Sequence, residues 1–399
     1  MANLAIKGGT PLREKGFPGW TQITPADIQG LQSVYDSNTW GINGPKNKEF
    51  REKFATYSGA KHCLTVANGT VSIELILRGL GIGRGDEVIV PPYTFIASIS
   101  SLIYAGVTPV FADIDPETYQ MSASSAEQCI TPRTKAIMPV YVGGCPADLE
   151  AFKALCEKHN LYLIGDAAQA VGSEYNGRGI TEYSIAASIS CQNSKNLTCG
   201  EGGIILTNNT PLYERINQMI NGGVDEQGEY SALGLANGMS EFQASILLTQ
   251  LEALPDQITK RMENAAYLDK RFGELDFVYP MKQDSMVTRN SYHLYLLGIK
   301  EEMLQGVSRA TFLEAVQAEG APITPGYVPV YSFPCLNGDY TKKCVGGEIN
   351  LTPNCPNAEK IGYHEGAWMY HATLLAEKED MDDIVNAVIK VYQNLDELK

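Results

Sequence analysis

The first half of the 399-residue chain alternates short, largely apolar runs with amphipathic stretches. The apolar runs have the length of buried strands and lie at 87–90, 107–112, 135–140, 161–164 and 204–206. Between them apolar residues recur three and four positions apart, as in helices that cover one face of a sheet. Strands that alternate with helices predict an α/β fold with a mainly parallel sheet covered on both faces.

An N-terminal extension precedes this pattern. Residues 1–40 are rich in turn formers and end in a helix that begins at Thr24-Pro25. Threonine is a good N-cap there, and proline suits the first helical position because its missing N–H has no partner in the first turn. We therefore expect an irregular arm followed by one helix.

The second half of the chain has a different pattern. A helix that starts near Glu241 is expected to end at Leu254-Pro255, which we interpret as a hinge. A strand-like run at 292–297 and an amphipathic stretch at 381–395 indicate an α+β arrangement. We expect a large domain over residues 1–255, including the arm and helix of residues 1–40, and a smaller C-terminal domain over 256–399.

Composition narrows the class of protein. The net charge of −15 and pI near 4.9 argue against nucleic-acid binding, which needs clustered Lys and Arg. No run approaches the ~18 apolar residues of a membrane helix, and the N-terminus lacks a signal-peptide pattern. The nine cysteines form no Cys-x-x-Cys pair, and Cys335, Cys344 and Cys355 lack zinc spacing. We expect a cytoplasmic protein with reduced thiols and no metal.

Two polar residues stand where a cofactor would need them. Asp166 directly follows the apolar run 161–164, and Lys195 lies between hydroxyl and amide side chains before the glycine-rich turn 200–203. Each residue also has an ordinary interpretation, the lysine as a solvated surface charge and the aspartate as a helix cap. Together they suit pyridoxal phosphate (PLP): a lysine amine forms the resting Schiff base, and a carboxylate keeps the pyridine nitrogen protonated.

These residues belong to a series of motifs. Asp166-Ala167-Ala168-Gln169-Ala170, Ser190 and Lys195 with Gly200-Glu201-Gly202-Gly203 resemble the DegT/DnrJ/EryC1/StrS aminotransferases. Further motifs in family order are Gly44-Pro45, Asn68-Gly69-Thr70, Gly85 to Pro91, Thr94-Phe95-Ile96-Ala97, Pro109 to Asp115 and Pro139-Val140-Tyr141. The resemblance covers most of residues 1–255 and continues more loosely to the C-terminus. It implies PLP-dependent transferase fold type I, with residues 1–255 as the PLP-binding domain.

The resemblance also implies roles for individual residues. Lys195 is the Schiff-base lysine and Asp166 the partner of the pyridine nitrogen. Phe95 stacks on the cofactor ring, and Gln169 contacts the cofactor near its 3-hydroxyl. Gly69, Thr70 and Ser190 bind its phosphate; the residues themselves support this for Asn68-Gly69-Thr70, because a strand that enters a helix there exposes free N–H groups.

The sequence departs from the family pattern at three positions. Relatives carry Gly-x-Asn-x-Arg-Met where this chain has Gly234-Leu235-Ala236-Asn237-Gly238-Met239, so Ala236 and Gly238 occupy the Asn and Arg positions. The family asparagine reaches the phosphate in the neighbouring subunit, and that contact is in doubt here. Gly165 stands where relatives commonly have Glu.

The resemblance implies a PLP-dependent aminotransferase that moves an amino group from glutamate or glutamine to a keto-sugar or keto-cyclitol in a ping-pong cycle. It also implies a homodimer with the active site at the interface. Gly8-Gly9-Thr10-Pro11, Gln192 and Trp368…His371 favour the scyllo-inosose and 3-amino-5-hydroxybenzoate synthase branch, with the role of His371 left open. Two alternatives remain: a PLP enzyme of the same fold that eliminates or dehydrates to an aromatic product, and a non-catalytic regulatory relative.

Overall fold

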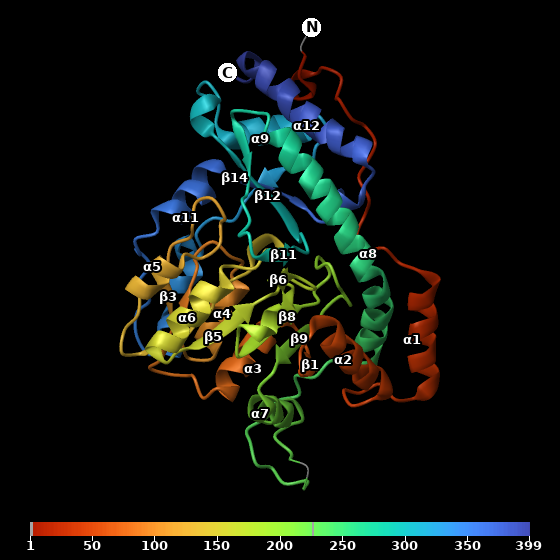
Figure 1. The fold of residues 1–399 in the computed structure, drawn as a ribbon, viewed down its shortest axis with the longest axis vertical. Coiled ribbons are helices and arrows are strands. Elements are labelled where there is room, and N and C mark those ends of the chain that lie inside the picture. Colours follow the sequence, from red (N-terminus) through yellow and green to blue (C-terminus); the bar gives the residue numbers. More distant parts are fainter. Residues whose placement is uncertain (1–2, 226) are drawn as a thin grey trace.

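A computed structural model describes residues 3–225 and 227–399, and its central feature is a seven-stranded mixed sheet (Figure 1). The strand order is β1–β9–β8–β5–β4–β2–β3, and all neighbours are parallel except β9, which is antiparallel to β1 and β8. In that order the strands are His62–Val66, Gly203–Thr207, Ala186–Ser190, Tyr162–Asp166, Thr134–Ile137, Glu87–Val90 and Thr108–Phe111. The predicted fold class, α/β with a mainly parallel sheet, is confirmed.

Helices cover this sheet and bury their apolar faces against it. Ile73, Ile76 and Leu77 of α3 are buried in one core, and Phe152 and Leu155 of α6 in another. The helices of this region are α2 (Pro45–Ser58), α3 (Gly69–Gly79), α4 (Ala97–Tyr104), α5 (Ala123–Gln128), α6 (Leu149–His159) and α7 (Thr210–Ile220). Asn68 caps α3 and Asp148 caps α6, each accepting a hydrogen bond from a backbone N–H of the first turn.

The helix expected to end at Leu254-Pro255 continues to Phe272, so its predicted end is wrong. This helix, α8 (Glu241–Phe272), contains Pro255 and runs from beside the large sheet to the C-terminal elements (Figure 1). A proline inside a helix loses one backbone hydrogen bond and crowds the preceding turn. Packing outweighs that cost here, because Leu254 and Ile258 on either side of Pro255 are buried.

The C-terminal residues build an antiparallel sheet of order β10–β12–β14–β13 at the far end of α8. Its strands are Val278–Pro280, Leu294–Ile299, Gly366–Tyr370 and Thr324–Pro325, and helices α9 (Arg309–Ala318) and α12 (Lys378–Gln393) pack beside it. A small third sheet joins β11 (Val287–Arg289), β6 (Glu174–Tyr175) and β7 (Arg178–Gly179). The expected strand and closing helix are therefore present, shifted by two or three residues.

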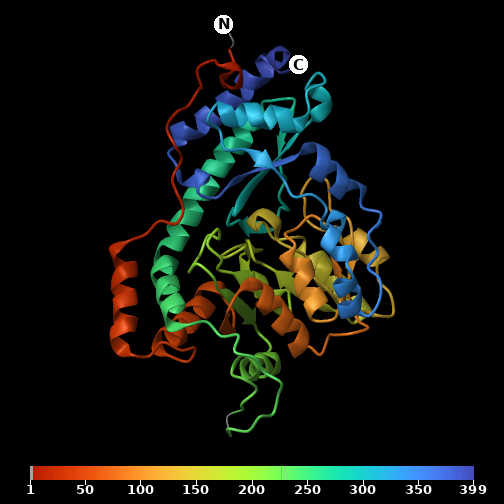
Figure 2. The same ribbon diagram turned by 180° about the vertical axis from the view of Figure 1, so that it is seen from behind.

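One C-terminal segment reaches the large sheet. Val330, Leu336, Val345 and Ile361 share a core with β1, β2 and α3. Helices α10 (Asp339–Val345) and α11 (Pro356–Lys360) lie in this segment, and Figure 2 shows them beside the elements of the large sheet. The C-terminal residues therefore contribute to both ends of the molecule.

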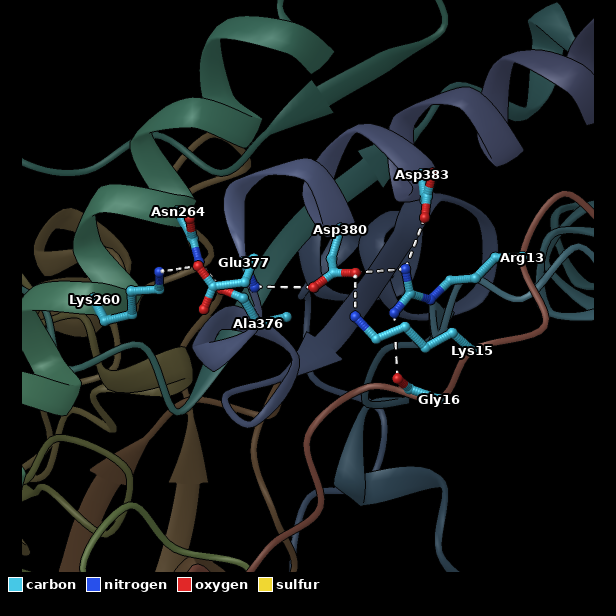
Figure 3. Close-up of polar contacts among 9 residues, drawn as sticks. All are labelled: Arg13, Lys15, Gly16, Lys260, Asn264, Ala376, Glu377, Asp380 and Asp383. Atoms are coloured by element: carbon cyan, nitrogen blue, oxygen red, sulfur yellow. Dashed lines mark hydrogen bonds and ion pairs between the residues drawn. The ribbon is translucent and has the colours of Figure 1, made fainter.

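The N-terminal arm begins beside the C-terminal elements and lies along α8 (Figure 2). Leu4 is buried in the core of the small sheet, and Arg13 forms ion pairs with Asp380 and Asp383 of α12, both at 2.7 Å (Figure 3). Helix α1 (Pro25–Ser37) follows, and its Asp27 carboxylate accepts hydrogen bonds from Thr24 and from Thr249 of α8. Within the described residues, no helix is long and apolar enough to cross a membrane.

Candidate active site

The residues singled out from the sequence gather at one edge of the large sheet. Gly69 follows β1, Asp166 ends β5 and Ser190 ends β8, and each lies at the carboxyl end of its strand. The sheet pairing brings these ends together, because Gly203 of β9 pairs with Val66 on one side and with Ser190 on the other. The carboxyl edge of an open α/β sheet is where such folds bind ligands.

Lys195 lies in the loop between β8 and β9. Its backbone N–H donates to the Gln192 carbonyl over 2.8 Å, which closes a turn that holds the lysine in place. Burial lowers the pKa of the Lys195 amine to about 8, although the carboxylate of Asp166 acts to raise it. At neutral pH about a tenth of such an amine is unprotonated, far more than for an ordinary lysine.

Asp166 is almost completely buried, with an exposed fraction of 2%. Its Oδ2 accepts a 2.6 Å hydrogen bond from Ser98 Oγ, and its Oδ1 accepts one from the Ala168 N–H. Burial raises the pKa of the Asp166 carboxyl, while these hydrogen bonds and the charge of Lys195 act to lower it. A buried carboxylate with so little compensation is well suited to a cationic partner.

Two further side chains predicted to contact a cofactor, Phe95 and Gln169, lie three residues along the chain from Ser98 and from Asp166. Phe95 lies in the turn before α4, next to Thr94, whose hydroxyl is 2.8 Å from that of Ser98. The Phe95 side chain is 56% exposed, unusual for a phenylalanine. Gln169 is buried, with its Oε1 accepting from the Gly143 N–H and its Nε2 donating to the Tyr327 hydroxyl.

Gly69, Thr70 and Ser190 form a narrow backbone seat. Asn68 accepts the N–H groups of Val71 and Ser72, so those of Gly69 and Thr70 lie outside the hydrogen bonds of the first helical turn. A Cβ atom on Gly69 would lie 2.9 Å from the Ser190 Cβ, closer than carbon atoms normally approach. Glycine therefore keeps open a helix N-terminus beside a hydroxyl, an arrangement that suits an anion.

Comparison with known proteins gives one consistent result. Residues 21–389 match the DegT/DnrJ/EryC1/StrS aminotransferase family. An L-glutamine:2-deoxy-scyllo-inosose aminotransferase of Streptoalloteichus tenebrarius is 34% identical, and the alignment covers 100% of this chain and 99% of that protein. The chain belongs to the DegT/DnrJ/EryC1/StrS aminotransferase family. It is an aminotransferase, as the sequence predicted.

Solved structures agree with this assignment. The crystal structure of 3-amino-5-hydroxybenzoic acid synthase is 29% identical with a TM-score of 0.86, over 96% of this chain and 99% of that one. The structure of S. venezuelae DesV in complex with a ketimine intermediate is 28% identical with a TM-score of 0.83, over 94% of this chain and 98% of that one. The predicted resemblance to the scyllo-inosose and aminohydroxybenzoate branch of the family is confirmed.

Two of the departures from the family pattern have a structural reason. A Cβ on Gly165 would lie 2.6 Å from the Tyr141 hydroxyl, so the ring of Tyr141 occupies the space beside the strand. A Cβ on Gly238 would lie 2.6 Å from Ile42, and Gly238 also bridges Val66 at the end of β1. Side chains as large as Glu or Arg cannot enter either position without displacing these neighbours.

Three further residues at the site lie outside the family motifs of the sequence. Ser98 bonds Asp166, and Tyr327 bonds Gln169 from the proline- and tyrosine-rich segment near residue 327. Arg261, in the middle of α8, contacts His371 behind Lys195. The only local signal for Ser98 is that its hydroxyl lies four residues after that of Thr94, and no local pattern marks Arg261.

Proposed function

We propose that this aminotransferase uses PLP, held by Lys195 and Asp166, to transfer an amino group from L-glutamine or L-glutamate to a keto-cyclitol. The observation that carries the proposal is the pairing at the sheet edge of a lysine whose pKa is lowered to about 8 with a buried carboxylate. An amine that is partly neutral at physiological pH and an acid that needs a cationic partner are the two groups that PLP chemistry requires.

The described residues fit the cofactor at each of its polar groups. The seat of Gly69, Thr70 and Ser190 would hold the phosphate, and Asp166 would hold the pyridine nitrogen. Phe95 would cover one face of the ring, and Gln169 would lie near the 3-hydroxyl. The seat is kept open by a glycine where a Cβ would collide with Ser190, and the exposed Phe95 lies three residues before Ser98, which bonds the carboxylate.

The chain's own residues then have distinct tasks. When bound, PLP supplies an electron sink that stabilises negative charge on the carbon from which a proton is removed. Asp166 would stabilise the protonated ring nitrogen of the bound cofactor, and Ser98 and the Ala168 N–H orient the two oxygens of the Asp166 carboxylate. Lys195, once its amine is free, removes and returns the proton at that carbon as a general base and acid. The lowered pKa of the Lys195 amine suits both the removal and the return of the proton near neutral pH.

Similarity to named enzymes indicates the substrate class. The relative from Streptoalloteichus tenebrarius aligns over the full length of this chain and is named for L-glutamine and 2-deoxy-scyllo-inosose. We therefore propose L-glutamine as the preferred donor and a scyllo-inosose-type cyclitol ketone as the acceptor. The 3-amino-5-hydroxybenzoic acid synthase structure keeps the aromatising elimination as the second candidate.

We also propose that the enzyme is a homodimer. Large apolar side chains are exposed on α1, in the connection from α1 to α2 and in the loop before α8, among them Ile28, Tyr35, Trp40, Tyr230 and Leu233. Leu233 is 99% exposed, which is costly for a leucine unless a partner covers it. A second copy of the chain is the partner that the family resemblance implies. Sedimentation analysis should give twice the chain mass.

The test is an absorbance spectrum of the purified protein with PLP, before and after L-glutamine, followed by mass analysis of the product formed with 2-deoxy-scyllo-inosose. A band of the lysine-bound cofactor that bleaches with L-glutamine, and a product that has gained an amine, would support the proposal. A product that has lost water instead would favour the elimination. Bound PLP without turnover of any donor would indicate a non-catalytic relative and contradict the proposal.

A further inference from the structure

Both neighbours of Lys195 in the chain are held by buried histidines from the C-terminal elements. His371, directly after β14, has its Nε2 2.9 Å from the Ser194 carbonyl oxygen. His293, directly before β12, has its Nδ1 3.1 Å from the Asn196 Oδ1. The two rings are stacked with centroids 5.5 Å apart. The segment that carries Lys195 is thus fixed on each side by a side chain distant in sequence.

The partners of His371 determine which of its nitrogens carries the proton. Its Nδ1 is 3.2 Å from Nη2 of Arg261, and a guanidinium can only donate hydrogen bonds. Nδ1 must therefore accept. The Ser194 carbonyl can only accept, so Nε2 must donate. His371 is held as the neutral tautomer with its proton on Nε2.

The partners of His293 require the opposite tautomer. Asn196 donates from its Nδ2 to the Ser291 carbonyl over 2.7 Å, which orients the amide so that Oδ1 faces His293. An amide oxygen can only accept, so Nδ1 of His293 carries the proton. Burial lowers the pKa of His293 well below its usual value, so this ring is neutral as well. The stacked pair thus consists of two neutral rings protonated on different nitrogens, each donating to the lysine segment.

Burying the charge of Arg261 beside His371 costs free energy of folding. It is completely buried, and Nε and Nη1 have no hydrogen-bond partner among the described residues. Its Nη2 also contacts Gln257 at 3.3 Å, and Trp20 of the N-terminal arm lies 5.7 Å from its guanidinium. A buried charge without a carboxylate partner costs stability. Such a cost is typical of a site where a group is kept for function.

The charges around His371 oppose its protonation. Arg261 on α8, His293 before β12 and Lys195 in its loop are the titratable groups that face it, and Trp20 covers it edge-on at 4.5 Å. Burial first, and then the charge of Arg261, lower the pKa of His371 to about 3, while the bond to the Ser194 carbonyl acts to raise it. His371 therefore stays neutral over the working range of pH and keeps one donor for Ser194.

We propose that His371, oriented by Arg261, is a positioning residue that fixes the Ser194 carbonyl and thereby holds the Lys195 amine in its partly desolvated place facing Asp166. The proposal rests on the proposed function, in which Lys195 is the reactive lysine. Groups that orient a reactive residue through one intermediate contact typically contribute 10- to 100-fold in activity. The Arg261–His371 pair is thus distinct from the residues that contact cofactor or substrate.

The first experiment measures the tautomers in the cofactor-free, full-length protein by nitrogen-15 NMR of labelled histidine. His371 should give the signals of a neutral ring with the proton on Nε2, and His293 those of a neutral ring with the proton on Nδ1, unchanged from pH 5 to pH 8. Arg261→Met should allow His371 to change tautomer or to titrate. A charged His371 at pH 6 in the unaltered protein would overturn the proposal.

The second experiment compares His371→Leu, which has no donor, with His371→Gln, whose amide can donate to Ser194 and accept from Arg261. The matched control is His364→Leu, because His364 is an exposed histidine paired only with Glu301. The amine of Lys195 is titrated in cofactor-free protein by competitive labelling with acetic anhydride and mass spectrometry. His371→Leu should move the labelling midpoint up toward the ordinary lysine value, and His371→Gln should restore it.

Turnover of the cofactor-loaded enzyme gives an independent readout. His371→Leu should lower kcat by about 10- to 100-fold with KM within about twofold, and His371→Gln should recover most of the loss. A folded His371→Leu protein that labels and turns over like His364→Leu would show that His371 has only a structural role. The labelling result does not depend on the ketone, so failure of the proposed substrate and failure of this proposal are distinguishable.

Discussion

Two groups of charged residues in this molecule are built in opposite ways. Where the N-terminal arm meets α12, the Arg13 guanidinium lies 2.7 Å from the carboxylates of Asp380 and Asp383. It also donates a hydrogen bond to the Gly16 carbonyl oxygen (Figure 3). At the edge of the large sheet, Asp166 and Lys195 influence each other's charge without an ion pair, and Arg261 has no carboxylate partner among residues 3–225 and 227–399. The guanidinium of Arg13 is thus paired with two carboxylates, whereas the charged groups at the sheet edge have no ion pair among the described residues.

The pKa shifts follow this difference. Burial would lower the pKa of Arg13, but Asp380 and Asp383 outweigh it and raise the value. Burial lowers the pKa of Lys195 to about 8 and that of Arg261 to about 9, and raises that of Asp166. Paired charges stabilise the fold, whereas underpaired ones cost stability and stay ready to react or to bind. Changes at the sheet edge should therefore affect activity, and changes at the arm should affect stability.

The largest effect is expected from Lys195→Ala. It removes the amine that we propose binds the cofactor and moves the proton, so amine transfer should fall below detection and the absorbance band of the lysine-bound cofactor should disappear. Thermal unfolding should change little, because no ion pair is lost. Lys53→Ala, on the exposed face of α2, is the control and should keep full activity. An unchanged band in Lys195→Ala would refute the assignment of this lysine.

Asp166→Ala should have the next largest effect. PLP should still bind through Lys195 and the phosphate seat, but kcat should fall by about 10²- to 10³-fold because the protonated ring nitrogen loses its counter-charge. The measurement is steady-state turnover of protein whose cofactor content has been checked by absorbance. Turnover close to that of the unaltered enzyme would contradict the pyridine-nitrogen role.

Arg13→Met should act on stability alone. It leaves the buried Asp380 with only the exposed Lys15 as a cationic partner, so the free energy of unfolding should fall by about 2–4 kcal/mol, with turnover per folded molecule unchanged. Lys15→Met is the matched control, because Lys15 is 75% exposed and only 3.4 Å from Asp380, and it should change stability by less than about 1 kcal/mol. Denaturant unfolding measures both.

The same variant has a defined pH dependence. The pKa of Asp380 is lowered from 3.8 in the folded protein: burial would raise it, but hydrogen bonds from Arg13 and the Glu377 N–H prevail. Its stabilising contribution is therefore complete above about pH 4 and is lost as the pH falls through the folded value. The stability difference between Arg13→Met and the unaltered protein should shrink below pH 4. A difference that stays constant down to pH 2 would exclude this ion pair as its source.

The smallest effect is expected in the pH dependence of the rate at which cofactor-free protein binds PLP. Only the neutral amine of Lys195 reacts, so the rate should rise about tenfold per pH unit up to about pH 8 and then level off. Asp166 acts to raise this pKa, so Asp166→Asn should move the profile to lower pH. Stopped-flow absorbance measures the rate. A profile that levels only near pH 10 would show that the amine is solvated.

Local motifs were sufficient for the sheet-edge residues. Asp166 ends a five-residue strand, Ser190 ends another, and Gly69 begins a helix, so each position is set by a short apolar run and the residue that follows it. Parallel pairing then brings strand ends of this kind to one edge without further information. For this reason the pattern of the sequence predicts the fold class, and the motifs at the strand ends carry the resemblance that predicts the family and the aminotransferase activity.

Tertiary packing, and not a local sequence pattern, determines where α8 ends and where Arg261 lies. Proline predicts a helix end, but burial of Leu254 and Ile258 carries α8 through Pro255 to Phe272. That continuation places Arg261 in line with His371, more than a hundred residues away in sequence.

The sequence by itself determined the strands, the caps and the residues at the strand ends, because neighbours along the chain dictate backbone conformation. Only the tertiary structure decided what lies behind Lys195: Arg261, His371 and His293 come from three elements of the second half of the chain. Their partners, tautomers and charges depend on burial and on contacts between distant segments. Those quantities do not exist until the chain is folded.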